Sequence, residues 1–296
     1  MNEPKPLVIA VSINGERSKE ENPNVPRSHD EIVASALACY EAGASILHAH
    51  NRDFRLKGAE AAEDYLAAWR RVREARPDAL WYPTLTGHGG QELEHFALID
   101  EAIGLHFGIV DCGSVAFARI GEDGEVNGSY YQNSFDQIRE AFAFHRRLNL
   151  GVQISVFEPG FLRIVLAYQR AGKLPQGTVV NFYFGGGDGA VQGSMPFGLP
   201  PTPSALDAYL DLLGDDGLPW TVSAWGSDLL KTDLPRLAIE KGGHIQIGLE
   251  SHFDPIDKPT NEEQVARVVE LARSMGRPVA DSHATLNAWN CPRGLD

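Results

Sequence analysis

Leu7-Val-Ile-Ala-Val-Ser-Ile13 and Ser45-Ile-Leu-His-Ala-His50 are two short apolar segments, and an amphipathic segment lies between them. Ser28 and Glu31 have the spacing of a capping box, so we expect a helix that starts after Ser28 and ends at its C-cap, Gly43. A helical connection returns the chain to the edge where the first strand began, so the two strands run parallel. The first fifty residues therefore predict a βαβ unit of the α/β class.

The same alternation of strand and helix continues to the end of the chain and gives eight units. Further strands are predicted over 80–85, 107–110, 151–157, 178–184, 220–223 and 245–249, and further helices over 60–74, 93–103, 135–147, 161–171, 204–213, 230–241 and 262–275. Eight such units fit a closed barrel better than an open sheet. No change in composition marks a boundary, so we expect one domain over residues 1–296, a TIM (β/α)8 barrel with a C-terminal tail.

Composition and charge argue against nucleic-acid and membrane partners. The 296 residues include 26 Lys and Arg against 40 Asp and Glu, a net charge of −14, which argues against a nucleic-acid partner because phosphate binding needs a basic surface. No signal peptide and no apolar stretch of the ~18 residues that span a bilayer are evident, so we expect a cytoplasmic protein without a membrane partner. Cys39, Cys112 and Cys291 are widely spaced, which suits a reducing compartment and offers no thiolate metal site.

His48 and His50 form the sharpest chemical signal. Residues two apart on a strand point to the same face, so these imidazoles stand roughly 7 Å apart at a strand end and converge. Catalytic Zn²⁺ takes three nitrogen or oxygen ligands and leaves one position open. Glu250 follows the last predicted strand and is the best-placed third ligand, because all strand ends meet at one rim of a barrel. The alternatives are hydrogen-bonded structural histidines and a solvated loop carboxylate.

The loop after the sixth strand contains the Gly-rich stretch Phe184-Gly-Gly-Gly-Asp-Gly-Ala-Val-Gln-Gly193. In a barrel this loop lies at the C-terminal face, where active sites are built.

An ordered set of motifs along nearly the whole chain resembles the β-keto acid cleavage enzymes. The motifs are Ile9-Ala-Val-Ser-Ile-Asn14-Gly15, Asn24-Val-Pro26, Ala38-Cys-Tyr-Glu-Ala-Gly43, His48-Ala-His50 with Arg52-Asp53, Thr86-Gly87, Gly113-Ser114, Gly185-Gly186, Gly242-Gly-His-Ile245, Gly248-Leu-Glu250 and Gly276-Arg-Pro278. The resemblance implies a TIM barrel that binds zinc through His48, His50 and Glu250, and a homo-oligomer, a tetramer or a dimer. It also implies that a small β-keto acid and acetyl-CoA exchange to give acetoacetate and a new acyl-CoA.

The resemblance suggests roles for side chains around the metal. Zinc would stabilise enolate-like charge as a Lewis acid. Thr86 and Ser114 would donate hydrogen bonds to the substrate carboxylate, and Asn14 and Gln246 are also expected to bind the substrate. Arg52 either binds an anionic substrate or pairs with Asp53.

The chain departs from the family pattern at the expected general base. Gln246 stands where the family usually has Arg, Ser251 where it has Asp, and Ala116 where Asn is common. An amide does not titrate and a serine hydroxyl needs its own activator, so Gln246 and Ser251 do not supply a base. We expect Glu158 or Glu16 to take this role, with Asp111 as a weaker candidate, and we keep Ser251 as the alternative proton carrier.

Three functions remain compatible with these residues. The first is zinc-dependent cleavage of a β-keto acid with acyl transfer to CoA. The second is a zinc-dependent hydrolase or lyase that acts on a keto or carboxylic substrate without CoA. The third is a metal- or ligand-binding protein that has lost its base.

Overall fold

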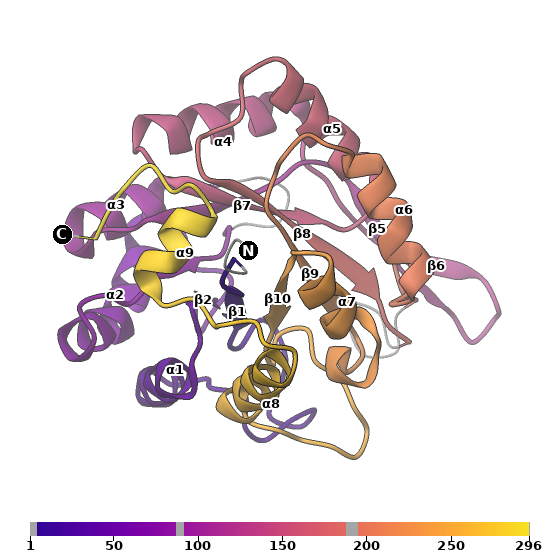
Figure 1. The fold of residues 1–296 in the computed structure, drawn as a ribbon, viewed down its shortest axis with the longest axis horizontal. Helices are drawn as coiled ribbons and strands as arrows, with labels where there is room; N and C mark the ends of the chain where they lie inside the picture. The colour runs from indigo at the N-terminus through magenta and orange to yellow at the C-terminus, as the bar shows by residue number, and fades with distance from the viewer. Residues whose placement is uncertain (1–4, 87–91, 188–194, 296) are drawn as a thin grey trace.

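The structure is a computed structural model that describes residues 5–86, 92–187 and 195–295. Eight parallel strands form a nearly closed barrel surrounded by helices (Figure 1). The barrel strands are β1 (Ile9–Ser12), β2 (Ile46–Ala49), β3 (Trp81–Pro83), β4 (Phe107–Asp111), β7 (Gly151–Val156), β8 (Thr178–Gly185), β9 (Trp220–Trp225) and β10 (His244–Ile247). The outer helices are α1 (His29–Ala42), α2 (Gly58–Ala75), α3 (Glu94–Ile103), α4 (Phe135–Arg147), α5 (Pro159–Arg170), α6 (Pro203–Leu213), α7 (Leu234–Glu240) and α8 (Asn261–Ser274).

The strand order around the barrel is β3-β2-β1-β10-β9-β8-β7-β4, and each neighbouring pair is hydrogen-bonded in parallel register. β3 and β4 lie next to each other at the remaining seam. This arrangement confirms the predicted TIM barrel, and it brings the C-terminal ends of all eight strands to one rim. Within the described residues, the helices are too short or too polar to cross a membrane.

The cap predicted for α1 is present. Ser28 Oγ accepts a hydrogen bond from Glu31 N at 3.2 Å, and the Glu31 carboxylate accepts one from Ser28 N at 2.9 Å. Gly43 ends the helix with a φ of 109°. The local sequence therefore sets where the chain turns back toward β2.

The helix predicted over 230–241 is divided into a short 3-10 helix, η1 (Leu229–Lys231), and α7. Pro235 explains the difference. Proline has no N–H to donate and its ring clashes with the carbonyl of the residue four earlier, so a continuous helix through this position is disfavoured. Pro235 instead lies in the first turn of α7, where prolines are tolerated.

A hairpin of β5 (Val115–Ile120) and β6 (Val126–Tyr131) follows β4 and was not predicted. It extends away from the barrel beyond the C-terminal ends of the strands (Figure 1). Its turn is closed by hydrogen bonds from Gly121 N to Glu125 O at 2.8 Å and from Gly124 N to Gly121 O at 3.0 Å. At its base, Tyr131 returns to the barrel and packs near Phe117 and Phe157.

The segment predicted as a C-terminal tail closes the opposite end of the barrel. It contains the helix α9 (Ser282–Ala288) and pairs with the start of the chain through Ala280 N and Leu7 O at 2.8 Å. Trp289 is fully buried and packs edge-on against Phe107, the first residue of β4. Arg277 donates to the carbonyl oxygens of Lys5 at 2.9 Å and Gly243 at 2.6 Å. These bonds hold the segment against the N-terminal ends of the strands, which we call the floor of the barrel.

Replacing Arg277 with Leu removes the donor from several buried carbonyl groups. Because hydrogen bonds to a charged donor contribute roughly 1.5 to 3 kcal/mol, we expect the free energy of unfolding to fall by about 2 to 3 kcal/mol in urea titrations. Arg273→Leu is the matched control, since Arg273 is an exposed arginine on α8. Equal unfolding midpoints for the two variants would contradict this account of the floor.

Candidate metal centre

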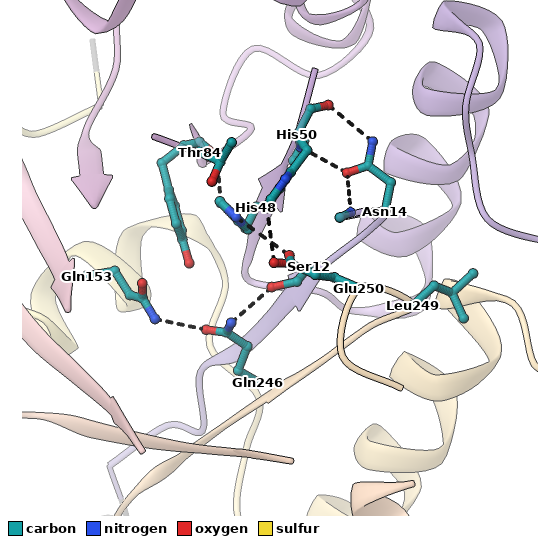
Figure 2. A network of polar contacts seen from close by, with 12 residues as sticks. Ser12, Asn14, His48, His50, Thr84, Gln153, Gln246, Leu249 and Glu250 are labelled. Carbon is teal, nitrogen blue, oxygen red and sulfur yellow. Dashed lines mark hydrogen bonds and ion pairs between the residues drawn. The ribbon is translucent and has the colours of Figure 1, made fainter. Parts of the chain in front are cut away.

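Three side chains at the ends of β2 and β10, the strands on either side of β1, converge on one point (Figure 2). His48 and His50 lie at the end of β2, and Glu250 lies three residues after β10. His48 Nε2 is 3.6 Å from Glu250 Oε2, and His50 Nε2 is 3.1 Å from Glu250 Oε1. One ligand atom from each of the three residues lies within 4.8 Å of the others.

His48 is oriented by β3. Its Nδ1 lies 3.2 Å from the Tyr82 carbonyl oxygen, which accepts only, so Nδ1 carries the proton and Nε2 presents its lone pair toward Glu250. The ring stacks on the Tyr82 ring at 4.7 Å. Burial lowers the pKa of His48 to about 4, against the opposing effect of Glu250. The imidazole is therefore neutral at physiological pH, as a metal ligand must be.

His50 is held through its backbone. Asn14 Oδ1 accepts a hydrogen bond from His50 N at 2.9 Å, and Asn14 Nδ2 donates to His50 O at 3.1 Å (Figure 2). The ring packs edge-on against His48 and near Phe54, with centroids 5.0 Å away in both cases. Neither ring nitrogen has a hydrogen-bond partner although both are buried. Asn14, expected at the substrate pocket, thus also positions a metal ligand.

Glu250 is buried and held by the first strand–loop connection. Its N–H donates to Ser12 O at 3.1 Å, and its carbonyl accepts from Arg17 Nε at 3.2 Å. A Cβ on Gly15, where φ is +56°, would lie 2.3 Å from Glu250 Cγ, so this approach requires glycine. Burial raises the pKa of Glu250, but His50, His48 and a Ser12 hydrogen bond outweigh it and lower the pKa to about 2. Glu250 is therefore a carboxylate.

The three residues fit a divalent cation. An ion bound 2.0–2.2 Å from each ligand in tetrahedral geometry separates the ligand atoms by about 3.3 to 3.6 Å, close to the spacings between Glu250 and the two histidines. Glu250 Oε2 is buried without a hydrogen bond, as are the His50 ring nitrogens. Buried polar atoms rarely lack a partner, and a bound cation would satisfy them.

Gln246 and Ser251, two of the three departures from the family pattern, are both buried beside this centre, whereas the third, Ala116, is exposed on β5. Gln246 Nε2 donates to Ser12 Oγ at 2.9 Å, and its Oε1 accepts from Gln153 Nε2 at 3.2 Å (Figure 2). The same Nε2 also donates to Tyr183 OH at 2.8 Å. Gln246 is thus the centre of a neutral network across the barrel. Ser251 follows Glu250 directly, and its carbonyl accepts from Gly226 N at 2.9 Å.

The remaining substrate-binding candidates all follow C-terminal strand ends. Thr86 is buried and donates to Glu92 Oε2 at 2.8 Å, whereas Ser114 is exposed and accepts from Asn133 N at 3.3 Å. Gly87, quoted with Thr86, and part of the Gly-rich stretch, 188–193, lie outside the described residues.

Arg52 does not pair with Asp53, which was one of its two expected roles. Asp53 binds Arg55, at 2.6 Å, whereas Arg52 binds Asp64 on α2, also at 2.6 Å. The Asp64 carboxylate also accepts the Arg52 backbone N–H at 3.0 Å, so one acid holds both groups. The Arg52 side chain remains 46% exposed.

The two carboxylates expected as bases sit at the rim. Glu158 precedes α5 and is partly buried, and its Oε1 accepts from Gly198 N at 2.9 Å. Glu16 is exposed after β1.

Several residues that support the site were missed from the sequence. Ser12 and Tyr82 flank the ligands, and both could have been found as the register partners of His48 on the neighbouring strands. Tyr131 reaches the rim only through the unpredicted hairpin, where its hydroxyl donates to Asp111 Oδ2 at 2.6 Å.

Comparison with known proteins places the chain among enzymes of one family. The model of the beta-keto acid cleavage enzyme family matches residues 6–287. The 3-keto-5-aminohexanoate cleavage enzyme of Fusobacterium nucleatum subsp. nucleatum is 31% identical over 285 residues, which cover 93% of this chain and 94% of the relative. The 3-oxoadipate:acetyl-CoA acetyltransferase of Cupriavidus necator is 26% identical over 281 residues, covering 93% and 92%.

Among solved structures, apo ObcA superposes with a TM-score of 0.68 at 15% identity. The match covers 92% of this chain and 66% of the ObcA chain, so the present chain spans about two thirds of that protein. At this identity the likeness concerns the fold alone.

We expect the purified protein to carry a divalent metal that is lost when its ligands are removed. His48→Ala and the double variant His48→Ala/His50→Ala should lose the metal, measured by elemental analysis, and should still unfold cooperatively because the ligands lie at the rim of the barrel. His283→Ala, an exposed histidine on α9 at the floor, is the control and should keep it. Full metal occupancy in the double variant would defeat this ligand assignment.

Proposed function

Because this chain belongs to the beta-keto acid cleavage enzyme family, we propose that it is a zinc-dependent enzyme that cleaves a carbon–carbon bond of a small β-keto acid. Acetyl-CoA is the proposed second substrate, and acetoacetate and a new acyl-CoA are the products. The observation that supports this most strongly is the buried His48–His50–Glu250 set at the catalytic rim of a barrel whose sequence matches the family over 6–287.

Zinc is the proposed metal because two histidines and one glutamate are an established catalytic zinc set. When bound, such an ion supplies a Lewis acid that stabilises negative charge developing on a substrate oxygen. The acetyl-CoA part of the proposal is supported by the C. necator relative, whose name includes that substrate.

Side chains around the centre would bind and orient the keto acid. Ser114 is a proposed donor to its carboxylate, and Thr86 becomes one if its hydroxyl turns from Glu92 to the substrate. Arg52, although paired with Asp64, offers a partly exposed cation. Asn14 keeps the His50 backbone in place, and Gln246 keeps the barrel interior neutral beneath the centre. The sequence left four candidates for proton transfer: Glu158, Glu16, Ser251 and Asp111.

A second function is favoured by one specific observation. Gln246 and Ser251 replace the Arg and Asp expected from the family, and Gln246 is fully engaged in neutral hydrogen bonds. The same metal centre would then serve a hydrolase or lyase that acts on a keto or carboxylic substrate without CoA.

A homo-oligomer, a dimer or a tetramer, is also proposed. The exposed side chains of Ile120, Val126 and Tyr130 on the β5–β6 hairpin form apolar surface of the kind that subunit contacts cover. Light scattering on the purified protein tests this, and a monomeric mass would contradict it.

Labelled acetyl-CoA separates the two functions. The zinc-loaded protein is incubated with a panel of β-keto acids and acetyl-CoA carrying ¹³C at the acetyl carbonyl. Acyl exchange retains C1 and C2 of the keto acid and adds the acetyl group, so we expect the label at C3 of acetoacetate by NMR. Consumption of the keto acid without CoA, with no labelled acetoacetate formed, would instead support the hydrolase or lyase. Binding without turnover would favour a non-catalytic protein.

A further inference from the structure

Asp111, the last residue of β4, points into the barrel. Gln153 on β7 faces the interior, since its amide reaches Gln246 on β10 across the barrel at 3.2 Å. In the β4–β7 ladder Ile109 is the partner of Gln153 and Asp111 is the partner of Ser155. Side chains two apart on a strand share a face, so Asp111 lies on the interior face, one layer closer to the catalytic rim than the Gln153–Gln246 pair.

The β5–β6 hairpin holds the Asp111 carboxylate. Tyr131, at the end of β6, donates its hydroxyl hydrogen to Asp111 Oδ2 at 2.6 Å. The Tyr131 ring is itself fixed by Phe117, with which it stacks, and by Phe157 at the end of β7, both at 6.3 Å between centroids. Asp111 is therefore a buried acid with a defined orientation rather than a solvated strand end.

Several buried groups interact electrostatically with Asp111. They are Tyr131, Ser155, Glu250, Tyr82 from β3, Tyr183 from β8 and the neighbouring Cys112. Burial raises the pKa of Asp111 to about 6, and Glu250 adds to this, while hydrogen bonds from Tyr131 and Ser155 act in the opposite direction. A carboxyl with a pKa in this range is suited to accept and return a proton at physiological pH.

The other acids at the rim are less suited to this task. One carboxylate oxygen of Glu158 accepts a hydrogen bond from Gly198 N and so holds the Gly198 loop. Glu16 is exposed to solvent. Gln246 and Ser251, at the positions where the family has Arg and Asp, are not acids. Among the described residues, the buried acids besides Asp111 and Glu250 are Asp64 and Asp228. Asp64 is paired with Arg52, and Asp228 caps η1 through Leu230 N and lies 3.9 Å from His252.

We propose that Asp111 is the base that removes a proton from C2 of the β-keto acid, with Tyr131 as the residue that positions its carboxylate. This inference rests on the proposed function. The C2–H bond breaks, its electron pair remains on the substrate as an enolate, and Asp111 carries the proton. The enolate attacks the acetyl carbonyl and CoA leaves as a thiolate. The thiolate then attacks the original keto carbon, the C2–C3 bond breaks, and C2 of the released acetoacetate recovers the proton from Asp111.

Hydrogen exchange at C2 of acetoacetate tests the base without CoA. Acetoacetate is the product whichever keto acid is the substrate, and the same base must act on it in the reverse direction. The zinc-loaded protein is mixed with acetoacetate in D₂O, and loss of the C2 proton signal is followed by NMR above the rate without protein. We expect Asp111→Asn to lower the exchange rate by at least about 100-fold, the lower end of what a general base contributes. Asp207→Asn, at an exposed aspartate on the outer helix α6, is the matched control and should retain exchange. Loss of exchange in Glu158→Gln, Glu16→Gln or Ser251→Ala, with Asp111→Asn at the wild-type rate, would assign the base to that residue instead.

The pH profile tests the role of Tyr131. Asp111 acts as a base only when ionised, so the exchange rate should rise with pH through the pKa of Asp111. A bound divalent cation moves this limb to lower pH, so variants are compared at equal metal content. Tyr131→Phe removes a donor to the ionised carboxylate and therefore raises the pKa of Asp111. We expect the acid limb of the Tyr131→Phe profile to move to higher pH while exchange persists on its plateau.

Metal content and circular dichroism of Asp111→Asn must match the wild type, because the substitution is nearly isosteric. Exchange at the wild-type rate in Asp111→Asn would overturn the proposal. So would a wild-type protein that binds acetoacetate without exchanging its C2 protons. A protein could show Asp111-dependent exchange and yet transfer no acetyl group from acetyl-CoA. That result would support Asp111 as the base and contradict acyl transfer. The two proposals can therefore fail independently.

Discussion

A buried carboxylate is the constraint around which the rim of this barrel is arranged. Removing an ionised carboxylate from water is costly unless hydrogen bonds or opposite charges compensate it. Glu250 is almost completely buried, accepts a hydrogen bond from Ser12 and has two imidazoles beside it, and its Oε2 has no hydrogen-bond partner. Gly15 permits its close approach to the first loop, Asn14 positions His50, and β3 orients His48. A cation bound here would complete this compensation.

The surroundings of Glu250 and Asp111 shift the pKa values of these two carboxyl groups in opposite directions. The two imidazoles lower the pKa of Glu250, whereas burial and the charge of Glu250 raise the pKa of Asp111 against hydrogen bonds from Tyr131 and Ser155. Opposite shifts of neighbouring acids are the usual way in which one site keeps one group ionised and another able to exchange a proton. The division suits a metal ligand and a base in the same cavity.

Local patterns in the sequence predicted the barrel because each strand–helix unit carries its own signal. The Ser28–Glu31 cap and the strand that ends in His48 and His50 depend on neighbours within a few residues, so spacing was enough. The partner of Arg52 depended on where α2 places Asp64, a contact between segments that spacing does not encode. Tyr131 was missed for a related reason, since its strand, β6, contains Asn127, Gly128 and Ser129 and has little hydrophobic periodicity.

The two departures at β10 are physically coupled. An Asp at 251 beside Glu250 would add a second negative charge in a buried region, and an Arg at 246 would balance it. Losing either charge alone would leave the other uncompensated, whereas losing both keeps the interior neutral. Gln246 fits this neutral state, because its amide hydrogen atoms reach Ser12 and Tyr183 and its oxygen accepts from Gln153. Under the proposed function, the proton-accepting role then needs another acid, and we propose Asp111 on β4, whose carboxylate the hairpin holds through Tyr131.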